Sequence, residues 1–359
     1  MINDYLYSAA TDKEGGLMAG LLKIILLVLS WIYGAVIRIL TFFYRLKPRR
    51  LPCKVVSIGN ITLGGTGKTP MVELVAKYLK KQSHKVAILS RGYKRKLSTY
   101  DLPAKSYELI GDEPYMLKEK LGDMPLLVDA DRIRSAGVAM RDYGVDTVVL
   151  DDGFQQWRIK KDLEIVTINA ANPFGNKHML PRGILREPIS SLKRADIFIL
   201  TKTDMAGDIQ PLKTYLQRIN PQALIVDTTY RPLGLCRITD PRGELTKPEA
   251  LKGESVAILC GIADPDSFKA LIENLGLKVG LFFKFADHYC YTKEDLVKII
   301  QESNSKNIRT IITTEKDMVR LPPMDYEAIP INFLALTIAI DFKDNEEEFR
   351  NRLLGLYRP

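Results

Sequence analysis

The sequence predicts an α/β protein with a three-layer α/β/α domain, a second, smaller α/β domain after it and an apolar helix before both. Three observations predict this arrangement. The chain has 359 residues, more than one hydrophobic core usually supports. Short buried strands alternate with helical patterns, as in parallel sheets, and residues 17–43 are almost continuously apolar. We place the apolar helix in residues 1–46, the three-layer domain in 47–230 and the smaller domain in 231–359.

The composition is that of a globular protein with an excess of basic residues. Lys and Arg number 52 against 43 Asp and Glu, which gives a net charge of +9. The four cysteines show no Cys-x-x-Cys pairing, which favours reduced thiols in a cytosolic compartment. The three histidines are too few for a histidine-rich metal site.

The N-terminal apolar segment has the pattern of a helix that lies in a membrane interface. Lys23 and Arg38 leave 14 uncharged residues between them, a rise of about 21 Å against a hydrocarbon core of roughly 30 Å. On a helical wheel one narrow polar stripe collects Gly20, Lys23, Ser30, Gly34, Arg38, Thr41 and Arg45. A core helix of a soluble domain and a tilted membrane span are the alternatives.

A basic run follows this segment directly. It contains no acidic residue and comprises Arg38, Arg45, Lys47, Arg49, Arg50 and Lys54. Basic residues next to an apolar helix favour an anionic membrane surface over nucleic acid, and they are expected to keep the rest of the chain cytoplasmic.

A glycine loop between a strand and a helix predicts a phosphate site. The strand 54–58 runs into Gly64-Gly65-Thr66-Gly67-Lys68-Thr69, and a helical pattern covers 70–80. Glycines let backbone N–H groups approach phosphate oxygens, Lys68 can reach the β and γ phosphates, and Thr69 can ligate Mg²⁺. The first glycine of the usual pattern would fall at Thr62, so this is a variant loop.

The acidic half of such a site is predicted at the end of another strand. The strand 147–150 is followed by Asp151 and Asp152, and Mg²⁺ requires hard carboxylate oxygens near the phosphates. An Asp-Asp-Gly turn by itself is more often a simple loop. Together with the glycine loop it predicts a domain of the P-loop NTPase type.

Further polar residues follow predicted strands, where ligands bind in open α/β sheets. Arg91 follows the strand 86–90, and Arg132 follows the strand 126–128 at a helix start. Asp112 is by itself most simply a helix cap. The Pro- and Gly-rich loop 178–188 carries paired arginines that suit an anion clamp. Thr201-Lys202-Thr203-Asp204 resembles a base-reading motif that lacks its Asn.

The second domain begins after Pro232 and contains no second glycine-lysine loop. A strand at 256–260 precedes a helix that Asp264 is expected to cap, with Pro265 behind it. The feature of this domain that best suits catalysis is the pair Asp287-His288. A lone histidine is usually structural, but a histidine with a neighbouring Asp can help to form a general base. Residues 313–317 end a further strand and are expected to face the cleft between the two domains.

Taken in order, these motifs resemble the tetraacyldisaccharide 4'-kinase family, the lipid A 4'-kinases of Gram-negative bacteria. The resemblance extends from about Leu17 to the end of the chain, and the ordered set is more specific than any one motif. The motifs are GNITLGGTGKTP at 59–70, SRGY at 90–93, GDEP at 111–114, DR at 131–132, DDGFQ at 151–155, LREP at 185–188, DH at 287–288 and TTEKD at 313–317.

The resemblance implies transfer of the ATP γ-phosphate to the 4'-hydroxyl of tetraacyldisaccharide 1-phosphate, an acylated glucosamine disaccharide lipid, to give lipid IVA. It implies ATP and Mg²⁺ as cofactors and the cytoplasmic face of the bacterial inner membrane as location. We expect no nucleic-acid partner, and we expect a monomer.

The family's functional residues are carried over to matching positions. The nucleotide would contact Gly64, Gly65, Thr66, Gly67, Lys68 and Thr69, and Mg²⁺ would contact Thr69, Asp151 and Asp152. The catalytic set would be Asp112 as base, assisted by His288, with Asp287, Glu113 and Lys68. The acceptor and phosphates would contact Arg91, Tyr93, Arg132, Arg186 and Glu187. With these boundaries, domain closure is expected to bring His288 to Asp112.

One departure and two rival functions accompany this resemblance. Family members commonly have His where this chain has Gln156, so the resemblance carries no ionisable or metal-related role over to that position. A membrane-recruited switch ATPase of the partitioning kind has a similar loop, but those proteins carry Lys where this chain has Leu63. A soluble small-molecule kinase or ligase is the other rival, and the interfacial helix argues against it.

Overall fold

The computed structural model describes residues 8, 10–12, 14–92, 111–241 and 243–358. The chain forms two compact units. Unit 1 comprises Met1–Arg91, Asp123–Thr229 and Phe342–Pro359, and unit 2 comprises Gly92–Gly122 and Tyr230–Asp341. The units therefore differ from the contiguous domains 47–230 and 231–359, because a segment around Asp112 belongs to unit 2 and the C-terminal segment belongs to unit 1.

Unit 1 is built on a parallel sheet with the strand order β3-β2-β4-β1-β5-β6-β7. The strands are runs of buried Val, Ile and Leu, as expected for a sheet covered on both faces. Their bounds are β1 Lys54–Gly59, β2 Val86–Ser90, β3 Leu126–Val128, β4 Thr147–Asp151, β5 Leu163–Asn169, β6 Ile197–Thr201 and β7 Leu224–Arg237. The strands predicted at 54–58, 86–90, 126–128 and 147–150 are confirmed.

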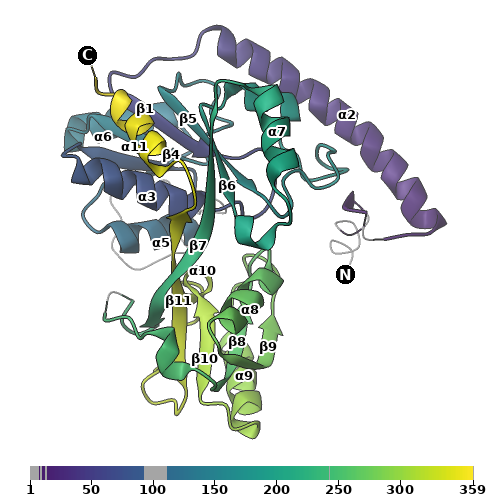
Figure 1. Cartoon of the computed structure of the whole chain (residues 1–359), viewed down its shortest axis with the longest axis vertical. Helices are drawn as coiled ribbons and strands as arrows, with labels where there is room; N and C mark the ends of the chain where they lie inside the picture. The colour runs from purple at the N-terminus through teal and green to yellow at the C-terminus, as the bar shows by residue number, and fades with distance from the viewer. Residues whose placement is uncertain (1–7, 9, 13, 93–110, 242, 359) are drawn as a thin grey trace. The chain divides into compact units, whose positions relative to one another are not determined.

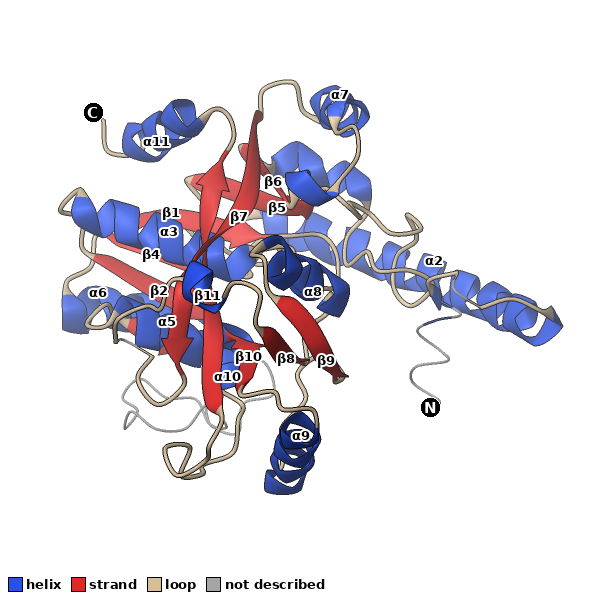
Figure 2. Ribbon diagram, turned by 60° about the horizontal axis from the view of Figure 1, so that its bottom comes forward, coloured by secondary structure: helices blue, strands red, loops and turns tan. Residues whose placement is uncertain are grey.

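Helices cover this sheet (Figure 2). α3 packs on β1, β2 and β4, and α6 packs on β2 and β3. A separate buried cluster joins α7 with β5 and β6, and Tyr33 and Ile37 of α2 pack against it. The bounds are α2 Leu17–Leu46, α3 Lys68–Lys81, α6 Arg132–Tyr143, α7 Gln210–Ile219 and α11 Glu346–Gly355, with 3-10 turns η1 Ile189–Arg194 and η2 Thr203–Met205.

α2 is a single long helix (Figure 1). Its apolar side chains are largely exposed. It is long and apolar enough to cross a membrane, and 11% of its most apolar window is buried, which argues against a core helix. The centre of the predicted polar stripe faces protein. Ser30 and Gly34 are buried, and Ser30 Oγ donates a hydrogen bond to the Met179 carbonyl at 2.8 Å. Tyr33, which is not part of the stripe, donates its hydroxyl to the Arg186 carbonyl at 3.0 Å.

Unit 2 contains the parallel strands β11-β10-β8-β9. Asp264 caps α8 by accepting the Ser267 N–H, as predicted. Thr292 begins α9 with a reciprocal capping box to Asp295. The bounds are α5 Asp112–Leu121, η3 Pro248–Leu251, β8 Ser255–Cys260, α8 Pro265–Asn274, β9 Lys278–Lys284, α9 Lys293–Ser305, β10 Thr310–Thr314, α10 Glu315–Met318 and β11 Asn332–Phe342.

The C-terminal segment returns to unit 1 and is held there by aromatic contacts. Phe349 of α11 is 1% exposed, and its ring centroid lies 5.3 Å from that of Phe342. Tyr357 stacks on His84 at 3.5 Å, and its hydroxyl lies 2.7 Å from the Thr147 hydroxyl at the start of β4. These contacts join the last residues of the chain to the strand that carries Asp151.

We expect Phe349→Ala to lower the free energy of unfolding by about 3–5 kcal/mol, because it removes a buried ring and leaves a cavity. Urea denaturation of the full chain measures the change. The matched control is Glu347→Ala on the exposed face of the same helix, which should stay within about 0.5 kcal/mol of the parent. Equal effects of the two substitutions would contradict the packing role of α11.

Candidate active site

The loop between β1 and α3 has the backbone conformations that phosphate binding requires. Gly64 has φ +101° and Gly67 has φ +83°, in the left-handed region that favours glycine. Gly67 directly precedes Lys68, the first residue of α3. Free N–H groups of the first helical turn therefore follow an exposed glycine turn, which is a geometry that binds anions.

Strand register brings the first carboxylate beside this loop. β1 and β4 are parallel neighbours with Ile58 opposite Asp151, so the end of β4 lies next to the start of the loop. Ser90, the last residue of β2, donates its hydroxyl to Asp151 Oδ2 at 2.8 Å. Three strand ends thus converge on one carboxylate.

Asp152 lies between two cations. Its Oδ2 accepts a hydrogen bond from Arg186 Nη1 at 2.7 Å, and its Oδ1 lies 3.6 Å from Lys68 Nζ. Lys68 Nζ also donates to Asn60 Oδ1 at 3.4 Å. Burial alone would raise the pKa of Asp152, but the charges of Lys68 and Arg186 outweigh it and lower the pKa. Asp152 is therefore an anion that orients both cations.

Arg186 is held in place by the backbone of the loop 178–188. Its N–H donates to the Ile61 carbonyl at 2.7 Å, and the Leu63 N–H donates to the Ile184 carbonyl at 2.7 Å. The adjacent Glu187 is fully buried and accepts hydrogen bonds from the side chains of Gln155, Trp157 and Arg194. Glu187 therefore anchors the loop, while Arg186 reaches the carboxylate of Asp152.

The remaining residues predicted for the site in unit 1 include both buried and exposed side chains. Thr66 is buried, with its hydroxyl 2.8 Å from that of Thr167. Arg132 is 2% exposed and donates to the carbonyl of Asp151 at 3.4 Å, so it supports the end of β4. Gln156 donates its N–H to the Gly153 carbonyl. Thr69 lies in the first turn of α3, and Gly65 lies in the exposed glycine turn. Arg91 is exposed and follows β2. Tyr93 lies outside the described residues.

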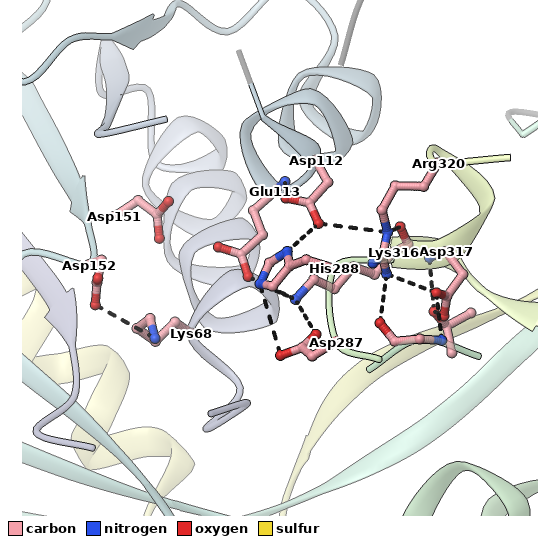
Figure 3. Close-up of polar contacts among 12 residues, drawn as sticks. Lys68, Asp112, Glu113, Asp151, Asp152, Asp287, His288, Lys316, Asp317 and Arg320 are labelled. Atoms are coloured by element: carbon pink, nitrogen blue, oxygen red, sulfur yellow. Dashed lines mark hydrogen bonds and ion pairs between the residues drawn. The ribbon is translucent and has the colours of Figure 1, made fainter. Parts of the chain in front are cut away.

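Unit 2 carries an acid–histidine pair (Figure 3). Asp112 is the first residue of α5, where its Oδ1 accepts the Glu113 N–H at 3.0 Å; the capping position itself is Gly111. His288 follows β9 with φ +61°, and its Nδ1 lies 2.8 Å from Asp112 Oδ2. Both residues belong to the same unit. The expectation that closure of two domains must bring them together is therefore wrong.

The second ring nitrogen of His288, Nε2, contacts a lysine. Lys316 Nζ lies 3.4 Å from His288 Nε2 and forms ion pairs with Glu113 at 3.3 Å and Asp287 at 3.6 Å. An ammonium group can only donate hydrogen bonds. Nε2 therefore accepts from Lys316, and we infer that Nδ1 carries the proton that points at Asp112.

The Asp112 carboxylate is held ionised by its neighbours. Burial would raise its pKa, but the hydrogen bond with His288 and the positive charges of Lys316 and Arg320 hold the pKa at about 2. Asp112 is therefore fully ionised at neutral pH and able to accept a proton.

Sequence reasoning missed Asn60, Lys316 and Arg320. Asn60 follows β1 directly, so its place at a strand end was a usable signal. Lys316 lies inside the motif 313–317, which follows β10, and the same rule about strand ends applies to it. Arg320 lies two residues beyond α10 in a stretch with no distinguishing pattern, so no signal pointed to it.

The depressed pKa of Asp112 predicts a pH-dependent contribution to stability. Its pKa is 3.8 before folding and about 2 in the folded chain. The stabilisation is complete above about pH 4 and is lost as the pH falls through about 2. The difference in unfolding free energy between the parent and Asp112→Asn should therefore shrink from pH 6 to pH 3, measured by urea denaturation. Glu254→Gln, at an exposed carboxylate of unit 2, is the control for charge removal.

Comparisons with known proteins identify the family of this chain. The model of the tetraacyldisaccharide-1-P 4'-kinase family matches residues 22–358. A tetraacyldisaccharide 4'-kinase of Halothermothrix orenii is 33% identical over 95% of both chains, and that of Desulfatibacillum aliphaticivorans is 34% identical over 94% of this chain and 92% of the other. The solved structure of LpxK from Aquifex aeolicus in complex with ATP aligns with a TM-score of 0.71 at 28% identity, covering 94% of this chain and 100% of that chain. This chain therefore belongs to the tetraacyldisaccharide-1-P 4'-kinase family.

Proposed function

We propose that this protein transfers the γ-phosphoryl group of ATP to the 4'-hydroxyl of tetraacyldisaccharide 1-phosphate to give lipid IVA. The observation that carries the proposal is the contact of Asp112 with His288 at 2.8 Å in a chain that also has a phosphate loop. A nucleotide switch has no need of a base that accepts an alcohol proton. Family membership and the likeness to an ATP-bound relative support ATP as the donor.

In the proposed reaction the acceptor hydroxyl oxygen bonds to the γ-phosphorus, and the bond from that phosphorus to the β,γ-bridging oxygen breaks. The hydroxyl proton passes to the Asp112 carboxylate, and ADP leaves. Lys68 and the N–H groups of the glycine loop stabilise the charge that spreads over the phosphoryl oxygens. A carboxylate with a pKa of about 2 is a weak base, so proton transfer is expected late in a loose transition state.

The roles of the neighbouring residues follow from their contacts. His288 donates to Asp112 and fixes its orientation, while Lys316 holds the ring through Nε2. Arg186 is paired with Asp152 at 2.7 Å, so it is placed to bind phosphate oxygens that enter the loop. We assign Glu113 and Asp287 to the support of Lys316, with which both form ion pairs.

The residues present fit a magnesium ion. Asp152 Oδ1 is buried, lies 3.6 Å from Lys68 Nζ and accepts no hydrogen bond from the described residues, so its lone pairs suit a cation. The described part of the chain holds no cluster of three or more His, Cys, Asp or Glu side chains. That agrees with Mg²⁺ in kinases, which takes one or two carboxylates together with phosphates and water. Thr69, Asp151 and Asp152 would hold the ion, which would neutralise charge on the phosphoryl oxygens.

We also propose that α2 lies in the cytoplasmic face of the bacterial inner membrane. Large apolar side chains are exposed along its length, from Leu17 at 83% to Leu46 at 59%. Arg38, Arg45, Lys47, Arg49 and Arg50 are exposed as well. A broad apolar face next to exposed cations is the surface that binds anionic lipid, and it would place the enzyme where an acylated acceptor is found.

The defining experiment is incubation with ATP, Mg²⁺ and the disaccharide 1-phosphate in detergent micelles. We expect a bisphosphorylated lipid, and Asp112→Ala should slow single-turnover transfer by about 10²–10⁴-fold because the proton acceptor is lost. Nucleotide affinity should be unchanged, since Asp112 is assigned no contact with ATP. Glu254→Gln is the control. Rapid ATP turnover without lipid product would favour the switch ATPase, and near-parental transfer by Asp112→Ala would exclude it as the base.

Membrane binding is tested separately with vesicles that contain anionic lipid. Reversal of two exposed charges, Arg49→Glu with Arg50→Glu, should weaken vesicle binding about 25-fold or more at low salt, at roughly 1 kcal/mol for each lost cation. Lys252→Glu with Lys306→Glu, at exposed positions of unit 2, makes the same change in net charge and should leave binding nearly unchanged. Equal losses for the two pairs would show a general charge effect.

A further inference from the structure

Arg320 is a buried cation that the proposed reaction does not use directly. Its side chain is 2% exposed, and its guanidinium contacts several elements of unit 2. Nε donates to the Lys316 carbonyl at 3.1 Å, and Nη1 donates to the Tyr289 carbonyl at 3.4 Å. A long basic side chain is rarely buried to this degree unless every donor has a partner.

The guanidinium lies near Asp112 directly and is linked to His288 through one shared backbone carbonyl. Arg320 Nε lies 3.7 Å from Asp112 Oδ2, the oxygen that also faces His288. Arg320 Nη2 donates to the Gly261 carbonyl at 3.0 Å, and the same carbonyl accepts the backbone N–H of His288 at 3.2 Å. One side chain therefore contacts the carboxylate of Asp112 and the carbonyl that holds the backbone of His288.

A second buried group fixes the orientation of Arg320. Asp317 is fully buried, and its Oδ1 accepts from Arg320 Nη2 at 2.8 Å, from the Gly261 N–H at 2.8 Å and from the Tyr291 hydroxyl at 2.7 Å. Asp317 compensates the positive charge of Arg320 and prevents rotation of its planar guanidinium group. Lysine presents one flexible point charge and cannot span the same contacts.

We propose that Arg320 is a positioning residue that holds Asp112 and the backbone of His288 in one fixed geometry for proton transfer. The proposal rests on the kinase activity proposed above and adds a residue that touches neither substrate nor nucleotide. His288 needs such support, because its φ of +61° is one that non-glycine residues seldom adopt. A shift of the pair by about 1 Å is enough to reduce a rate about 10²-fold.

The charged groups around Asp112 set the expected pH behaviour. α5 contributes Glu113, the turn after β9 contributes Asp287 and His288, and α10 contributes Lys316 and Asp317, with Arg320 beyond it. Arg320 is one of the cations that lower the pKa of Asp112. Its removal should therefore raise that pKa and move the acid limb of the kcat profile to higher pH.

The test compares Arg320→Met and Arg320→Lys with the full-length parent and with Arg309→Met, which removes an exposed arginine of the same unit. We expect Arg320→Met to lower kcat for lipid phosphorylation about 100-fold and to shift the acid limb upward, with KM for ATP within threefold of the parent. Arg320→Lys should keep the acid limb near its original pH and still lose at least tenfold in kcat. Arg309→Met should behave as the parent.

A double variant separates positioning from a general loss of structure. Because Arg320 and His288 would act on the same carboxylate, His288→Ala with Arg320→Met should be no more than about threefold slower than the slower single variant. Multiplicative losses would overturn the proposal, as would parental kcat in either folded Arg320 variant. If Arg320→Met does not unfold cooperatively, Arg320→Lys decides alone by its kcat. Absence of lipid phosphorylation in the parent would instead refute the proposed function.

Discussion

The parallel pairing of β1 with β4 is the constraint on which the phosphate site depends. With Ile58 opposite Asp151, the backbone hydrogen bonds of the two strands fix where the glycine loop leaves the sheet and where the carboxylates begin. A slip by one residue would turn β4 over relative to β1 and move each of its side chains, Asp151 included, to the opposite face of the sheet. The positions of Lys68 and Asp152 therefore follow from the register of a hydrophobic sheet before any charge interaction contributes.

Buried charges in this protein are compensated in groups. In unit 1, Glu187 accepts from Arg194, which also lies 3.8 Å from Glu164, and Lys161 pairs with Glu164 in turn. In unit 2, Asp317 and Arg320 form the centre of a similar group. Removal of one member leaves a buried charge without compensation, which is costlier than the loss of a surface pair. Each group consequently fixes a loop that carries a polar residue of the candidate site.

Local patterns in the sequence predicted the strands, the glycine loop and the caps, because each depends on neighbouring residues. Asp264 caps α8 for the same reason that any Asp before a helix-starting Pro does. The assignment of Asp112 to unit 2 depends on contacts with residues about 175 positions away and leaves no local trace. The polar stripe of α2 was identified from its spacing, but the burial of Ser30 against Met179 depends on a distant loop. Arg320 was missed because its role comes entirely from tertiary contacts.

The hydrogen bonds from α2 to the loop 178–188 have a geometric consequence. Ser30 and Tyr33 bind backbone carbonyls, including that of Arg186, so the distance between the helix and this arginine is fixed by main-chain atoms. If α2 rests in a bilayer, the bilayer surface becomes the reference plane for the phosphate site. An acceptor anchored by its acyl chains in the same leaflet is then presented at a constant depth. Substrate selection would then depend in part on the height of the acceptor hydroxyl above the lipid.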